Sequence, residues 1–115
     1  MMKIDYELKL KEILEKTAHI EVAKEKIELA ISMAKEVGIE MTFTQRLGIS
    51  SHLCAMVNRH FEGGDIPDVD PEMFKEVSQT SIDLAARVCE LLPNLVEGEK
   101  YLLSIHFEAA RLSKS

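Results

Sequence analysis

The chain has 115 residues, of which 46% are hydrophobic and 30% are charged, with a formal net charge of -6 and no tryptophan. A chain of this length buries enough surface for one core, and its composition is too rich in core-forming residues for a disordered segment. The acidic balance, without a lysine- or arginine-rich patch, argues against direct nucleic-acid binding, which needs clustered positive charge.

The first two elements are predicted to be amphipathic helices. Residues 5–16 are strongly charged, with leucine and isoleucine gathered on one stripe. Residues 19–37 place isoleucine, alanine and valine at intervals of three and four, which is the period of a helix with one buried face. Gly38 is placed to end this second helix, because glycine tolerates the left-handed conformation that is common there.

A third helix is predicted to follow Thr44, whose side chain would cap it, and to end at Gly63. The sequence Gly-Ile-Ser that starts at Gly48 admits a second interpretation, because such turns occur in helix-turn-helix DNA-binding motifs. Residues 51–61 would then be the recognition helix. The acidic charge of the chain and the apolar residues within 51–61 favour one continuous helix with a tolerated Gly48.

Two more helices are predicted in the second half of the chain. The sequence Asp-Pro-Glu at residues 70–72 is typical of a helix start, with aspartate at the cap and proline at the first helical position. This fourth helix is predicted to continue to Pro93, and a fifth from about Glu97 to a polar tail at Ser113. Since no segment alternates like a half-buried strand, we predict an all-α, single-domain bundle of about five helices over residues 1–115.

Several classes of protein do not fit this sequence. Cys54 and Cys89 lie far apart among apolar residues, which argues against a disulfide scaffold and a zinc ribbon. No stretch approaches the roughly 20 apolar residues that cross a membrane, and the first residues do not resemble a signal peptide, so we expect a cytoplasmic protein. Because no nucleophile elbow or comparable motif occurs, we expect that the protein is not an enzyme and has no catalytic residues and no cofactor.

The histidines are the candidates for chemistry. They are His19, His52, His60 and His106. No Glu-x-x-His pattern occurs and His60 is eight residues from His52, so we expect no metal site. His52 and Arg59 are seven residues apart and therefore share a helix face. His106 lies on a line with Glu99 at the edge of an apolar stripe. On periodicity alone, each of these two histidines is a half-buried packing residue.

Two short patterns carry a resemblance to a known family. They are His52-Leu-x-x-x-x-x-Arg59 in the third predicted helix and Tyr101-Leu-x-x-Ile-His106-Phe in the last. Together with the number of helices and the spacing of about fifty residues between the two histidines, they resemble the phosphotransferase-system regulation domain, or PRD. Such modules occur in bacterial sugar-utilisation antiterminators and activators. The resemblance implies a five-helix bundle, here as a stand-alone single-domain member.

The resemblance also implies a function and partners. His52 and His106 match the family's two phosphoacceptor positions, and Arg59 matches its arginine. The implied partner is a phosphocarrier protein or a sugar-transport EIIB-type protein, the implied assembly is a homodimer, and the implied role is transcriptional regulation. Because a guanidinium group matches phosphate bidentately, Arg59 and Arg46 are the candidates for phosphate contact.

Two other functions fit the residues. One is an unmodified helical dimerisation or interaction module, in which both histidines are packing residues. The other is a small-ligand or nucleic-acid-binding domain, in particular a helix-turn-helix DNA-binding protein. Composition does not separate the first of these from a phosphorylated domain. Solvent access at the two histidines bears on the choice, since a phosphoryl donor must reach the ring that it modifies.

Overall fold

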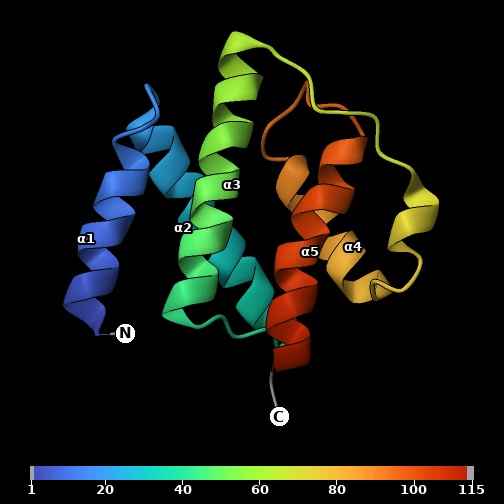
Figure 1. The fold of residues 1–115 in the computed structure, drawn as a ribbon, viewed down its shortest axis with the longest axis horizontal. Helices are drawn as coiled ribbons and strands as arrows, with labels where there is room; N and C mark the ends of the chain where they lie inside the picture. The colour runs from blue at the N-terminus through green and yellow to red at the C-terminus, as the bar shows by residue number, and fades with distance from the viewer. Residues whose placement is uncertain (1, 114–115) are drawn as a thin grey trace.

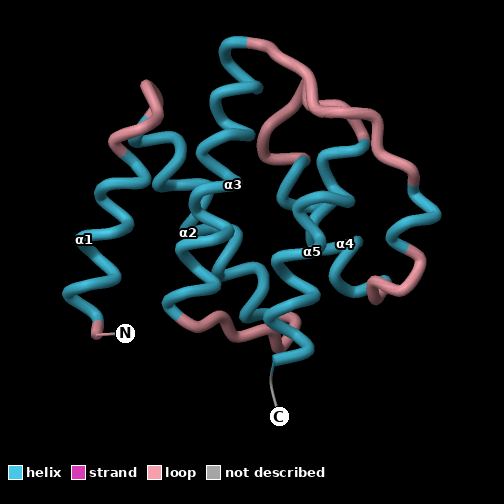
Figure 2. Tube along the Cα trace, in the orientation of Figure 1, coloured by secondary structure: helices cyan, strands magenta, loops and turns pink. Residues whose placement is uncertain are grey.

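The computed structural model describes residues 2–113, and within them helices follow one another without a strand (Figures 1 and 2). The α-helices are α1 (Lys3–Leu14), α2 (Ile20–Glu36), α3 (Phe43–Glu62), α4 (Gln79–Cys89) and α5 (Gly98–Ser113). A short 3-10 helix, η1 (Pro71–Phe74), lies between α3 and α4. The predicted all-α bundle is confirmed, and the bounds of α1, α2 and α5 lie within two residues of the predicted ones.

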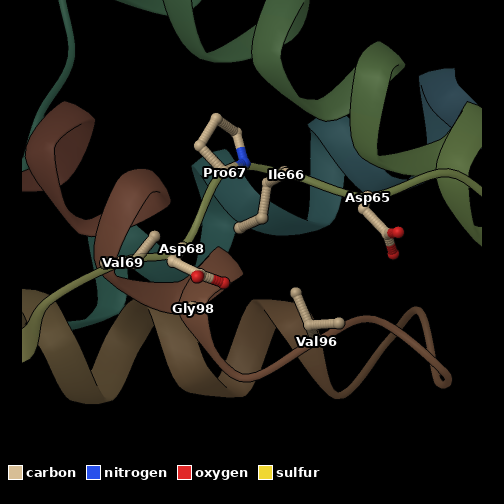
Figure 3. Close-up of a pocket in the computed structure, with 7 residues that line it drawn as sticks. All are labelled: Asp65, Ile66, Pro67, Asp68, Val69, Val96 and Gly98. Atoms are coloured by element: carbon tan, nitrogen blue, oxygen red, sulfur yellow. The ribbon is translucent and has the colours of Figure 1, made fainter.

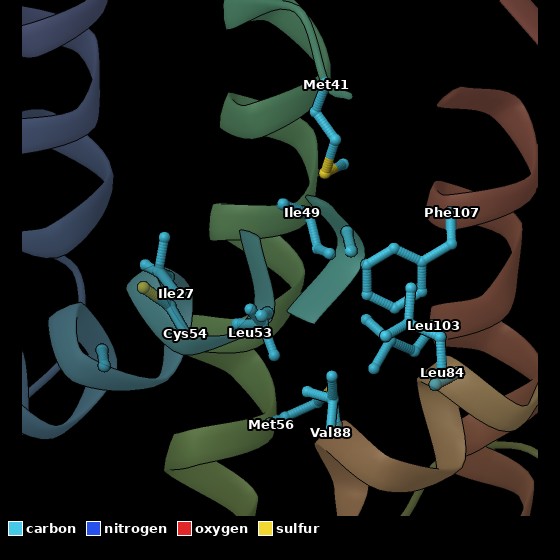
Figure 4. Close-up of a cluster of buried hydrophobic side chains, with 14 of the residues drawn as sticks. Ile27, Met41, Ile49, Leu53, Cys54, Met56, Leu84, Val88, Leu103 and Phe107 are labelled. Atoms are coloured by element: carbon cyan, nitrogen blue, oxygen red, sulfur yellow. The ribbon is translucent and has the colours of Figure 1, made fainter. Parts of the chain in front are cut away.

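Helix α3 occupies the centre of the bundle (Figure 1). It contacts α1, α2 and α5, while α4 packs mainly on α5. The centre of the core is formed by fully buried side chains of α3, α4 and α5 (Figure 4): Ile49, Leu53, Met56, Leu84, Val88, Leu103 and Phe107. Burying one such side chain stabilises a fold by roughly 1.5–3 kcal/mol, so this cluster holds α3 and α5 in a fixed relation.

Helix α3 begins earlier than predicted. Thr42 Oγ1 accepts the backbone N–H of Gln45 at 3.2 Å, and Gln45 Oε1 accepts the backbone N–H of Thr42 at 2.9 Å. This reciprocal capping box satisfies two backbone donors at once, so Thr42 is the cap and the prediction of Thr44 is wrong. The helix runs without interruption through Gly48, which confirms one long helix and rules out a helix-turn-helix turn there. Gly63, with φ of 79°, terminates it as predicted.

The predicted fourth helix is divided into two. Its expected start is present, since Asp70 Oδ1 accepts the backbone N–H of Glu72 at 3.0 Å and Pro71 is the first residue of η1. Helix η1 ends at Phe74, however, and the chain turns before α4 begins. The prediction of one helix from residue 70 to Pro93 is therefore wrong.

A contact with α5 sets the new start. Glu108 of α5 accepts the backbone N–H of Ser78 at 3.1 Å and the Ser78 hydroxyl at 2.8 Å. Ser78 in turn caps α4 by accepting the backbone N–H of Ser81 at 3.2 Å. Glu108 thus satisfies the backbone N–H of Ser78 and holds its hydroxyl from a distant helix, and this part of the arrangement has no local signal in the sequence.

Candidate functional site

Helices α3 and α5 lie side by side and run in opposite directions (Figure 1). Along their contact, three pairs of polar side chains face each other: Gln45 with Ser113, His52 with His106, and Arg59 with Glu99. On each helix the three members are seven residues apart. Because seven residues make nearly two helical turns, the pairs form one line, which we call the polar ladder.

The histidine pair is the middle step of the polar ladder. The rings of His52 and His106 lie edge to face, with centroids 5.2 Å apart and planes at 76°. Both side chains are half-buried. Nε2 of His52 is buried and has no hydrogen-bond partner within residues 2–113. The structure thus brings together two histidines that are far apart in the sequence.

Both rings are held in the neutral form at neutral pH. Burial is the main cause that lowers the pKa of His52 to about 4. The charge of a protonated His106 and that of Arg59 lower this pKa further, and the Glu99 carboxylate opposes them. Burial also lowers the pKa of His106 from its ordinary value. A neutral imidazole keeps one nitrogen lone pair, so each ring is a potential nucleophile.

Arg59 and Glu99 form the next step of the ladder. Arg59 Nε donates to Glu99 Oε2 at 2.6 Å, and Arg59 Nη2 donates to Glu99 Oε1 at 2.7 Å. The Glu99 side chain is 1% exposed and that of Arg59 is 20% exposed. The carboxylate therefore depends on this one bidentate partner for its charge compensation. Glu99 lies seven residues before His106, and this spacing is the signal in the sequence for its place in the ladder; a role for Glu99 is not part of the sequence-based prediction.

The comparison with solved structures identifies the family. The chain is similar to a PRD-containing transcription regulator from Lactobacillus casei ATCC 334, with a TM-score of 0.87 and 38% sequence identity. The match covers 90% of this chain and 93% of that chain. The chain belongs to the PRD family. No family model and no curated protein matches the sequence of this chain.

Arg46 lies elsewhere in this PRD. Its Nε donates to the backbone oxygen of Met41 at 3.1 Å, and its guanidinium carbon lies 5.8 Å from the centre of the Phe43 ring. It lines one hollow between α1 and α2 together with Tyr6 and Lys35, and a second beside the segment that follows α2, together with Lys35 and Ile39. The contacts of Arg46 are therefore with that side of the bundle, and the structure does not bring it to the histidine pair.

The other two histidines of the PRD lie near the C-terminal end of α3. The ring of His19 stacks on Phe61, with centroids 4.2 Å apart, and its Nε2 lies 3.0 Å from Glu62 Oε2. His60 Nδ1 lies 2.6 Å from the backbone oxygen of Pro93, in hydrogen-bond contact. Both rings thus join loops to α3. Neither contributes to the polar ladder.

A hollow of about 460 Å³ lies beside the loop that follows α3 (Figure 3). It is lined by Asp65, Ile66, Pro67, Asp68, Val69, Val96 and Gly98. Two carboxylates and no basic side chain line it, so it is poorly suited to a phosphate group.

Within the described chain, no three metal-ligating side chains gather around a common point. Among helices of residues 2–113, none combines the length and apolar character of a bilayer span.

Proposed function

We propose that this PRD is a phosphorylation-responsive regulatory domain of a bacterial sugar phosphotransferase-linked system, with His52 and His106 as its phosphoacceptors. The observation that carries the proposal is the histidine pair itself. Two uncharged imidazoles face each other across α3 and α5, one ladder step from an arginine. The nitrogen of a neutral imidazole can attack phosphorus, and a guanidinium group can bind the phosphoryl group that results.

The Arg59–Glu99 ion pair, the next step of the ladder, would convert phosphorylation into a structural response. Phosphorylation adds nearly two negative charges and three strong acceptor oxygens. A phosphoryl group on His52 would compete with Glu99 for Arg59, which lies seven residues along the same helix. If Arg59 turns to the phosphate, the buried Glu99 carboxylate loses its partner, which is strongly unfavourable. Helices α3 and α5 would then have to rearrange, and this converts a chemical mark into a change of shape.

The proposal names partners as well. The phosphoryl donor would be a phosphocarrier protein or a sugar-transport EIIB-type protein, and the domain would act as a homodimer with no enzymatic activity of its own. The relative from Lactobacillus casei is named as a transcription regulator, which supports a role in transcriptional regulation for this PRD. With a formal charge of -6, the chain would affect nucleic acid through another protein or domain more readily than by direct contact.

Two observations favour the second candidate, an unmodified interaction module. The edge-to-face contact of His52 and His106 and the enclosed Nε2 of His52 are also what packing residues show. In that case, replacing either histidine changes the free energy of unfolding and nothing else. The two candidates therefore differ in whether the rings acquire phosphate.

The test is phosphorylation in vitro. The purified protein is incubated with phosphoenolpyruvate, enzyme I and the phosphocarrier protein, and acid-labile phosphate is located by mass spectrometry. We expect phosphate on His52 or His106, and none in the protein that carries both His52→Gln and His106→Gln. His60→Gln is the matched control and should leave the phosphate content unchanged. Absence of acid-labile phosphate from the unaltered protein, or equal labelling of the double variant, would favour the interaction module.

A further inference from the structure

The ring of His106 faces a glycine. Gly48 lies on α3, one turn before His52, and is exposed to solvent. A Cβ atom on Gly48 would lie 3.6 Å from both Cε1 and Nδ1 of His106. The other atoms of that ring would be more than 4 Å away. The space that the missing side chain leaves therefore borders the edge of the ring that carries Nδ1.

Neither the backbone nor the packing requires glycine at this position. Gly48 lies inside a continuous helix, and the glycines with positive φ are Gly38, Gly63 and Gly64. A distance of 3.6 Å is ordinary van der Waals contact, so alanine would fit beside the unmodified ring. Glycine in a helix interior costs about 1 kcal/mol relative to alanine. The fold thus keeps a destabilising residue where a stabilising one has room.

The two histidines differ in how open they are. Nε2 of His52 is buried and has no hydrogen-bond partner among the residues that the structure describes, whereas the Nδ1 edge of His106 borders the exposed position of Gly48. A phosphoryl group is larger than a methyl group, and on Nδ1 it would stand at the edge of the ring that a Cβ atom on Gly48 would face at 3.6 Å. Alanine would therefore leave the free ring undisturbed and obstruct the modified one.

We propose that the gap at Gly48 is the opening through which His106 is phosphorylated, and that Nδ1 is the nitrogen that takes the phosphoryl group. This inference rests on the proposed function and adds the reacting atom of His106 and the residue that gives access to it. Gly48 acts by leaving room, so it is a positioning residue.

The transfer step is a single displacement at phosphorus. The Nδ1 lone pair of neutral His106, whose proton is on Nε2, attacks the phosphorus of a phosphohistidine on the donor protein. The new N–P bond forms as the donor's N–P bond breaks, and the donor ring, which carries a proton on its other nitrogen, leaves with the bonding pair as a neutral imidazole, so that its positive charge passes to the ring of His106. His106 keeps its proton on Nε2, so no base or other reactant is needed.

The experiment uses the His52→Gln protein, in which His106 is the remaining member of the pair, and adds Gly48→Ala. With phosphoenolpyruvate, enzyme I and the phosphocarrier protein as the donor system, we expect the rate of labelling to fall at least about tenfold in Gly48→Ala, a size typical of a displaced reacting group. The urea midpoint of unfolding should stay equal or rise, because alanine favours the helix. Ser51→Ala, an exposed change on the same helix, should label at the parent rate.

Phosphorus-31 NMR of the labelled protein with Gly48 intact gives a readout that does not depend on any variant at Gly48. The two phosphohistidine isomers have distinct resonances, and we expect the Nδ1 isomer. Phosphate on His106 at Nε2, or an undiminished rate in Gly48→Ala, overturns this inference and leaves the proposed function standing. No phosphate on His52 or His106 of the unaltered protein contradicts the proposed function itself.

Discussion

Arg59 and Glu99 join the two helices that carry the histidine pair, through two hydrogen bonds of 2.6 and 2.7 Å to a carboxylate that is 1% exposed. Removing one partner of such a pair leaves the other charge buried or half-buried and uncompensated. The consequence is unequal for the two residues, because Arg59 retains access to water and Glu99 does not.

We therefore predict that Arg59→Gln lowers the free energy of unfolding by about 3–5 kcal/mol, as for a broken buried ion pair, and that Glu99→Gln lowers it less. Urea unfolding monitored by circular dichroism measures both. The matched control is Lys100→Gln, whose partner Glu97 has an 80% exposed side chain, and this change should have little effect. Equal losses for Arg59→Gln and Glu99→Gln would contradict the burial argument.

The pKa of His52 predicts how stability depends on pH. Its value in the folded protein, about 4, is below the ordinary value of 6.5, so the unfolded chain binds the proton more readily. The free energy of unfolding should therefore be at its full value above pH 6.5 and decrease as the pH falls from 6.5 towards 4. His52→Gln should flatten this decrease. An NMR titration of the His52 ring with a midpoint near 6.5 would show that the ring is not enclosed as described.

Glu108 is predicted to be essential for the start of α4. It accepts hydrogen bonds from Ser78, Ser81 and Arg111, and the Arg111 contact, followed by those of the two serines, lowers its pKa to about 2. Glu108→Gln should reduce the free energy of unfolding by about 1–3 kcal/mol at neutral pH. The stabilisation should be complete above pH 4.5 and be lost as the pH falls through about 2.

Glu97→Gln, at an exposed position, is the matched control for Glu108→Gln, because among the described residues the Glu97 carboxylate forms a hydrogen bond and ion pair with Lys100 alone. It should leave the urea midpoint nearly unchanged. Hydrogen exchange gives a local readout, since the Ser78 and Ser81 amides should exchange faster in Glu108→Gln. Unchanged exchange at both amides would mean that the serine cap forms without Glu108.

Two helical glycines should respond in opposite ways to alanine. A Cβ atom on Gly98 would lie 3.1 Å from Cγ2 and 3.2 Å from Cβ of Val69, which is too close without a shift of the loop. Gly98→Ala should therefore destabilise the fold by about 1–3 kcal/mol, whereas Gly48→Ala should not. Adding Val69→Ala should recover part of the loss from Gly98→Ala in urea unfolding. Strict additivity of the two changes would exclude this contact as the cause.

The sequence predicted the helices better than it predicted their partners. Seven-residue spacing placed Arg59 on the face of His52 and Glu99 on the line of His106. That the two lines meet depends on how α3 and α5 pair, which local periodicity does not encode. Arg46 was chosen by residue type, yet it is six residues from His52, which is not a whole number of turns, and it faces another part of the bundle.

The break in the predicted fourth helix has a similar origin. Residues 70–72 carried a genuine start signal, and the structure uses it for one short turn. The second start at Ser78 depends on a carboxylate from α5, thirty residues further along the chain. Ser78 is itself a local capping signal, but the stronger signal at residues 70–72 stood for the whole predicted helix, and the contact with Glu108 that supports the second start lies outside any window of neighbouring residues.

The regular spacing of the polar ladder limits how the two helices can move. Between its steps lie the apolar side chains of Leu53, Met56 and Leu103, so a slide of α5 by one turn would set charged and imidazole groups against hydrocarbon. Pairing would be restored only after a displacement of a whole seven-residue repeat, roughly 10 Å along the axis. The ladder thus opposes sliding of α5 along α3. Any motion that phosphorylation causes would therefore tilt α5 or separate it from α3.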